Sequence, residues 1–122
     1  MAAPNVVQVT SIYGNTKGAP LDTTTTTGIL TCASNKLYKI NSIICANVDG
    51  SNSCDVTCSF YDSSETTAFH LAKTIVVPAD ATLVVMGKDA PIYLEEADEI
   101  RAGASANSDL ELVISYDILD DA

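Results

Sequence analysis

The stretch that decides the fold is LELVISYDILD, residues 110–120. Apolar side chains recur at every second position from Leu110 to Ile118, and Glu111 and Asp117 are among the residues between them. Successive side chains of a β-strand point to opposite faces of its sheet, so this alternation places five apolar residues on one side. The stretch therefore predicts a strand with one face in a hydrophobic core.

The same period of two recurs along the chain, whereas helical spacing of apolar residues is absent over any window of a dozen residues. The sequence predicts an all-β fold, a two-sheet antiparallel β-sandwich resembling a jelly roll. Turn residues separate about nine short strands. We predict them at residues 5–12, 24–32, 36–46, 53–61, 67–77, 81–87, 91–94, 98–105 and 109–118.

Two further groups of alternating apolar residues should complete the core. One is Val56, Cys58 and Phe60 together with Cys54, and the other is Phe69, Leu71, Ile75 and Val77. At 122 residues, without repeats or linkers, residues 1–122 are expected to form a single domain.

The balance of apolar and charged residues indicates an assembled protein. The chain is 47% hydrophobic and 18% charged, below the roughly 25% charge typical of soluble domains. A small domain cannot hide that much apolar area in its own core, so we expect part of it to lie on the surface and to be covered by a partner.

Net charge narrows the choice of partner. Sixteen acidic and six basic side chains give a net charge of −10, which repels nucleic-acid phosphates and anionic lipid. The first ten residues lack the basic and apolar regions of a secretory signal, and no apolar run approaches the roughly 20 residues that span a bilayer. We expect neither nucleic-acid nor membrane binding, and synthesis in a cytoplasm.

Two segments near the amino end are the expected partner contacts. Residues 1–8 are interpreted as an N-terminal arm, and residues 14–27, GNTKGAPLDTTTTT, as an extended loop that becomes a strand at the threonines. The run from Thr23 to Thr27 is expected to be an exposed edge strand, because β-branched residues favour extended backbone. A hydroxyl ladder that recognises sugar or ice would need repeats that the sequence lacks.

The loop in IICANVDGSNSCDV, residues 43–56, is the most site-like stretch. A two-residue type I′ turn at Asp49 and Gly50 would place Cys45 opposite Cys54 in a close pair. A disulfide is then compatible with the geometry, but a reducing cytoplasm favours two buried free thiols. Zinc is disfavoured, since Cys54 and Cys58 would lie about 13 Å apart on one strand. A calcium loop would use Asp49, Ser51, Ser53 and Asp55, but the stretch lacks the glycine and the closing glutamate of such loops.

No catalytic constellation stands out, and we expect no enzymatic activity, no metal and no cofactor. His70 is the only histidine, and pairing with Cys58 or Cys32 as a nucleophile has no motif behind it. The acids of LEEADEI are interpreted as a solvated charge run rather than a glycosidase pair. The acidic end is interpreted as a solvated or partner-facing segment rather than a metal site. These residues are Glu95, Glu96, Asp98 and Glu99 in the first group and Asp117, Asp120 and Asp121 in the second.

Three blocks resemble small all-β virion structural proteins of tailed bacteriophages, particularly those of cyanobacterial phages. They are LYKINSIICANVDG at 37–50, KTIVVPADATLVVMGKDAPIYLEEADEI at 73–100 and LELVISYDILD at 110–120. The shared pattern is a Y-K-I-x-S-I strand leading into an Asn-containing hairpin, a V-P-x-x-x-x-L strand pair and a closing Ser-Tyr strand. It covers about two thirds of the chain and consists of strands and turns rather than a catalytic signature.

The resemblance implies a non-enzymatic capsid cement or decoration protein that sits on the virion surface. Its partners would be the major capsid protein and itself, as a homo-oligomer for which a trimer is one form. A component of the neck, tail or fibre base is the alternative. A carbohydrate-binding sandwich is a second alternative, although the chain has no tryptophan to stack on a sugar.

Overall fold

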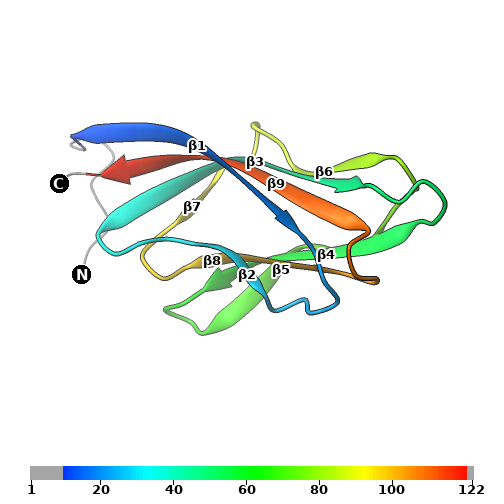
Figure 1. The fold of residues 1–122 in the computed structure, drawn as a ribbon. Helices are drawn as coiled ribbons and strands as arrows, with labels where there is room; N and C mark the ends of the chain where they lie inside the picture. The colour runs from blue at the N-terminus through cyan, green and yellow to red at the C-terminus, as the bar shows by residue number, and fades with distance from the viewer. Residues whose placement is uncertain (1–9, 121–122) are drawn as a thin grey trace.

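The computed structural model describes residues 10–120, which form nine strands in two antiparallel sheets, with no helix in this range (Figure 1). The all-β sandwich predicted from the alternating pattern is therefore confirmed. The strands are β1 (Ser11–Pro20), β2 (Gly28–Thr31), β3 (Lys36–Asn47), β4 (Cys54–Asp62), β5 (Thr67–Val77), β6 (Thr82–Met86), β7 (Ile92–Leu94), β8 (Glu99–Ala104) and β9 (Leu110–Asp120).

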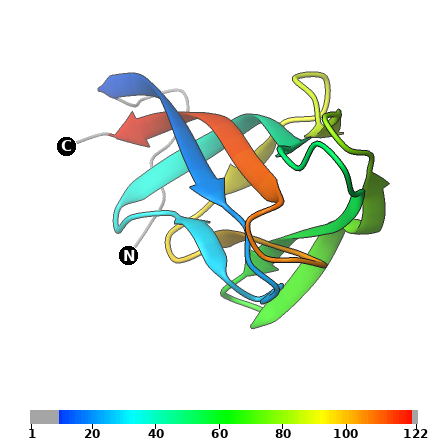
Figure 2. The same ribbon diagram turned by 45° about the vertical axis from the view of Figure 1, so that its right-hand side comes forward.

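The strand order is that of a jelly roll. Sheet A runs β1-β9-β3-β6, with the short β7 also paired to β3, and sheet B runs β2-β8-β4-β5. Pairing of β1 with β9, β2 with β8, β3 with β6 and β4 with β5 describes one long antiparallel hairpin. Additional pairing of β9 with β3 and of β8 with β4 closes that hairpin into two layers, seen in Figures 1 and 2.

The position of the first strand differs from the one expected from the sequence. A strand was expected at 5–12 and an extended loop at 14–27, but β1 occupies residues 11–20 and pairs along its whole length with β9. Only residues 21–27 form a connecting loop, while residues 1–9 lie outside the described part of the chain. Because β1 is an edge strand and mostly exposed, it needs no run of alternating apolar residues, and none marks it in the sequence.

The threonine run is a turn rather than an edge strand, which corrects the second expectation. The Asp22 carboxylate accepts a hydrogen bond from the Thr24 N–H at 2.9 Å, and the Thr27 hydroxyl donates to the Thr24 carbonyl at 3.2 Å. Short polar side chains that bond nearby backbone compete with strand pairing. Extended propensity is therefore overridden by local hydrogen bonds, and β2 begins only at Gly28.

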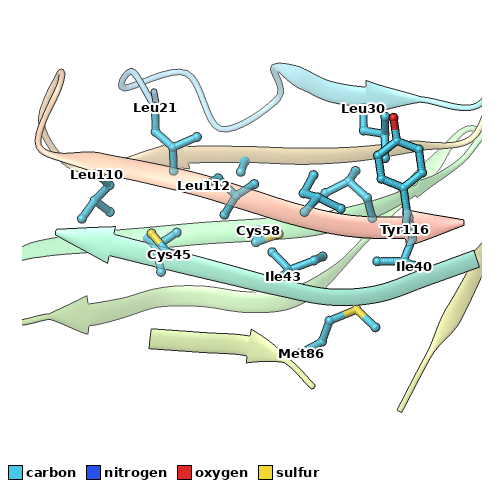
Figure 3. Packing of buried hydrophobic residues seen from close by; sticks show 14 of the residues in the cluster. Leu21, Leu30, Ile40, Ile43, Cys45, Cys58, Met86, Leu110, Leu112 and Tyr116 are labelled. Atoms are coloured by element: carbon cyan, nitrogen blue, oxygen red, sulfur yellow. The ribbon is translucent and has the colours of Figure 1, made fainter. Parts of the chain in front are cut away.

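The core lies between the sheets and is filled mainly from β3, β4, β8 and β9; Figure 3 shows part of this cluster. The predicted inward faces of β9 and β4 are confirmed, since Leu110, Leu112 and Ile114 are fully buried and so are Val56 and Cys58. The predicted face of β5 is wrong in part. Val77 is buried, but Phe69 is 52% and Ile75 is 42% exposed.

The reason lies in the position and shape of β5. This strand is an edge of sheet B, and its register with β4 shifts between Ile75 and Ala72. Thr74 adopts a positive φ of 48° at this irregularity, and its N–H donates a hydrogen bond to the Thr57 hydroxyl. A bulge bends an edge strand and breaks the strict inward-outward alternation.

The β4–β5 turn offers a stability prediction. Thr66 has a φ of 49°, and its N–H donates to the Ser63 carbonyl at 3.3 Å. A β-branched residue is strained at positive φ and glycine is not, so Thr66→Gly should raise the free energy of unfolding by about 1 kcal/mol. Urea unfolding measures this change. Glu65→Gly, at a neighbouring position without positive φ, should give no gain, and a loss of stability in Thr66→Gly would contradict the strain argument.

Candidate interaction face

The cysteine loop is a connection between the two sheets, not a two-residue hairpin. Cys45 pairs with Leu83 and Leu112 in sheet A, whereas Cys54 pairs with Val77 in sheet B. The type I′ turn considered from the sequence, and with it the direct pairing of Cys45 with Cys54, is therefore not formed. The reason is local, because Asn47 accepts the Asp49 N–H with its side chain and so turns the chain away from β3.

All four cysteines are free and buried, as predicted for Cys45 and Cys54. Burial raises the pKa of Cys45 to about 11 and that of Cys58 to about 12. Burial likewise raises the pKa of Cys32 to about 11. The thiolate is the reactive form, so these thiols are weak nucleophiles at neutral pH.

His70 does not meet a cysteine across the sheet. It pairs with Ser59 on β4 and is exposed, whereas Cys58, one residue away, is fully buried and points into the core. Neighbouring strand residues face opposite sides of a sheet, so the backbone separates the thiol of Cys58 from the imidazole. The cysteine–histidine pair weighed from the sequence is not assembled by β4 and β5.

The acidic stretch 95–99 is not simply solvated, which corrects another expectation. Asp98 is only 4% exposed, and its Oδ1 accepts hydrogen bonds from the Ser63 N–H at 2.9 Å and the Ser63 hydroxyl at 3.0 Å. Its Oδ2 accepts the Glu95 N–H at 3.0 Å. Asp98 thus ties the β7–β8 turn to the β4–β5 turn, a structural role.

Several of the other acidic candidates are also engaged within the fold. Glu96 accepts the Asn35 N–H at 2.9 Å, and Glu99 forms an ion pair with Arg101 at 2.9 Å. Asp120 forms an ion pair with Lys36, while Asp121 lies outside the described residues. Hydrogen bonds from Ser51 and Asn52 lower the pKa of Asp49, the first residue of the calcium-like stretch. Within residues 10–120 no three His, Cys, Asp or Glu side chains are placed to hold a metal ion.

The outer face of sheet B is mostly polar along β4 and β8 and is partly covered, although Val76 on the edge strand β5 is 56% exposed. The Arg101 guanidinium lies 3.7 Å from the centre of the Tyr61 ring and bonds Glu99. At Gly103 the backbone of Thr24 and Thr25 crosses directly over β8, so close that an added Cβ would lie 2.5 Å from the Thr24 oxygen. This face is organised by its own side chains and by the threonine turn.

The outer face of sheet A is different, because an apolar row crosses it. The strand register places Gly18 of β1 next to Val113 of β9, Val113 next to Ile44 of β3, and Ile44 next to Val84 of β6. The residues directly before and after Val113, and those directly before and after Ile44, are buried in the core. Val113 and Ile44 therefore point away from the core. Val84 is 60% exposed. We call these four residues the apolar row.

A second row crosses the same face nearer the other end of β9. It consists of Gly14 of β1, Asp117 of β9, Lys39 of β3 and Tyr93 of β7, in that order. Tyr93 is 46% exposed, and no ion pair between Lys39 and Asp117 occurs among the described residues. We call these four residues the charged row.

A shallow hollow lies at the Gly18 end of the apolar row. It has a volume of about 240 Å³ and is lined by residues 18–20 of β1 and 111–113 of β9. A Cβ placed on Gly18 would meet only the Leu112 carbonyl, at 3.9 Å, so the missing side chain leaves the surface open there. Sheet A therefore presents a depression at one edge and a projecting valine at the other.

Sequence reasoning missed this face, although a signal was present. Val113 interrupts the polar positions of LELVISYDILD, and Ile44 follows Ile43 where strict alternation calls for a polar residue. Each departure puts an apolar side chain on the solvent side of a strand. Only the register shows that the two valines and the isoleucine lie side by side.

Comparisons with known proteins add no identity to this geometry. No protein-family model matches the chain, and neither a curated protein nor a solved structure matches it. Residues 10–120 contain no helix that is long and apolar enough to cross a membrane.

Proposed function

We propose that the protein is a non-enzymatic structural component of a virion, most specifically a cement or decoration protein on the capsid of a tailed bacteriophage. The observation that carries the proposal is the apolar row on the outer face of sheet A. Neighbouring apolar side chains on the solvent side of the central strands of a sheet are typical of a subunit that another protein covers. The three resembling blocks supply the virion context, and jelly rolls are common among capsid proteins, an analogy at the level of fold.

The fate of the reactive groups supports an interaction role. Burial keeps the thiols of Cys32, Cys45 and Cys58 protonated at neutral pH. The Asp98 carboxylate accepts hydrogen bonds from two turns, and His70 pairs with Ser59 rather than with Cys58. Each of the residues that suggested chemistry in the sequence is thus used for packing or turn formation, or is isolated.

Cementing would operate by mass action. A protein that binds the assembled shell and not the dissociated subunits stabilises the shell by its free energy of binding. The proposed partners are the major capsid protein and further copies of this chain. Two segments are proposed to reach the shell: residues 1–8, which lie outside the described part, and residues 21–27, the part of the expected segment 14–27 that β1 does not include.

The test is the composition of purified virions of the virus that encodes the chain. Quantitative mass spectrometry should find the protein at a fixed ratio to the major capsid protein, high enough for copies on every face of the shell. A few copies per particle would move the proposal to the neck, tail or fibre base, and absence from particles would refute it. Deletion of residues 1–8 should lower occupancy on stripped particles while leaving thermal unfolding unchanged.

A further inference from the structure

We infer that the outer face of sheet A is a self-association interface, in which two copies pack face to face about a two-fold axis. The axis runs parallel to the strands, between β3 and β9. This inference deepens the self-association included in the proposed function, and it names the surface, the symmetry and the contacting residues.

Shape is the first argument. In both rows the β1 edge ends in a glycine, Gly14 or Gly18, and the opposite edge ends in an exposed large side chain, Tyr93 or Val84. A two-fold axis between the two central strands places the β1 edge of each copy over the β6 and β7 edge of the other copy. Val84 then enters the hollow at Gly18 of the second copy, and the reverse contact forms by symmetry.

The centre of the apolar row fits the same axis. Ile44 on β3 lies over Val113 on β9 of the second copy, so the exposed parts of both side chains are removed from water together. An axis across the strands, through the apolar row, would instead set Val84 against Val84 and leave Gly18 facing Gly18. That arrangement opposes two projections and two hollows, so the axis along the strands is favoured.

Charge is the second argument. Lys39 and Asp117 occupy neighbouring central strands in the charged row, so the axis sets Lys39 over Asp117 of the second copy, twice. Glu111 pairs with Ala46 within one chain, so the axis sets Glu111 over Ala46 of the second copy. No like charge therefore faces Glu111 there. A chain of net charge −10 resists self-association on most of its surface, and here the charges complement each other.

Area is the third argument. β1, β3 and β9 are 10 to 12 residues long, and the shorter β6 and β7 both border β3. With strands about 4.8 Å apart and about 3.3 Å per residue, the face presents roughly 600 Å² per copy. Two copies then bury roughly 1,200 Å², the lower end of the range for specific interfaces. The two sheets would pack about 10 Å apart in the aligned manner of sandwiches, at an angle set by their twist.

Sedimentation equilibrium of the full chain tests the inference. The wild-type protein should sediment as a dimer, at twice the 12.8 kDa mass of one chain. Val84→Glu should weaken dimerisation at least tenfold, because it drives a carboxylate into an apolar hollow. Lys39→Glu should also weaken it, and the exchange Lys39→Glu with Asp117→Lys should restore it. The matched control is Val76→Glu on β5, since Val76 is 56% exposed but belongs to sheet B.

Each alternative result overturns a stated part. A wild-type monomer or trimer refutes the two-fold interface, and so does a dimer that Val84→Glu weakens no more than Val76→Glu does. Failure of the double exchange to restore association refutes the axis along the strands. Circular dichroism and urea unfolding confirm that each variant is folded. Virion composition does not enter these outcomes, so a solution monomer would remove this interface and leave the virion proposal to be judged on particles.

Discussion

Gly103→Ala is expected to lower the free energy of unfolding by about 3 kcal/mol, through overpacking and lost hydrogen bonds. The added Cβ would lie 2.5 Å from the Thr24 oxygen and 2.7 Å from the Thr24 carbonyl carbon, both backbone atoms. Backbone cannot rotate aside as a side chain can, so the threonine turn must move off β8. That movement breaks the hydrogen bonds from Ala104 N–H to the Asp22 carbonyl and from Ala102 N–H to the Thr27 carbonyl.

Gly87→Ala is the matched control for this variant. A Cβ at Gly87 meets nothing within 4 Å, and its φ is not positive. The same chemical change should therefore be neutral or stabilise by a few tenths of a kcal/mol, because alanine restricts the unfolded chain. Urea unfolding of both variants measures the contrast. Equal stability of the two would show that the turn does not press on Gly103.

Asp98→Ala is expected to cost about 2 to 4 kcal/mol, because it leaves buried donors without an acceptor. The carboxylate accepts from the backbone N–H groups of Ser63 and Glu95 and from the Ser63 hydroxyl. Without it, the β4–β5 turn and the β7–β8 turn lose their common anchor. Asp98→Asn should lose less stability. Its side-chain oxygen can still accept the hydrogen bonds from Ser63, but its NH₂ group is a donor and would face the Glu95 N–H, which is also a donor.

Asp89→Ala provides the control for the loss of a carboxylate. Asp89 is exposed in the turn between β6 and β7, and its removal should change stability by less than about 0.5 kcal/mol. Thermal and urea unfolding of the three variants give the order of stability. If Asp98→Ala were as stable as Asp89→Ala, the turns would be held by other contacts and the assigned role of Asp98 would be wrong.

These two residues also show where sequence reasoning stops. Gly103 sits in a strand with no turn signal around it, and its need for glycine arises from residues 24–25, nearly 80 positions earlier in the chain. Asp98 lies among three other acids and looks equivalent to them in the sequence. Its burial depends on Ser63, which a separate hairpin supplies. Neither contact has a local pattern, because the partners meet only when the long hairpin closes into two layers.

The outer face of sheet A shows the same limit of sequence reasoning, because its residues can be recognised in the sequence but their grouping cannot. The composition indicated surplus apolar surface, and Val113 and Ile44 already stood at outward positions of their strands. Their common row with Gly18 and Val84 follows from the register of four strands that are far apart in the chain. The loop expected at 14–27 was partly wrong, because residues 11–20 join sheet A as β1 by pairing with β9.

By itself, the sequence determined the all-β class, the positions of most strands and the inward faces of β4 and β9, because the alternation of side chains is a local property of extended backbone. The tertiary structure decided which strands are neighbours, where β1 lies and how the threonines turn. It also placed Cys45 and Cys54 in different sheets and brought an apolar row to one surface. These features depend on pairing between distant segments, whose register is set by the burial of the whole core and not by any one stretch of residues.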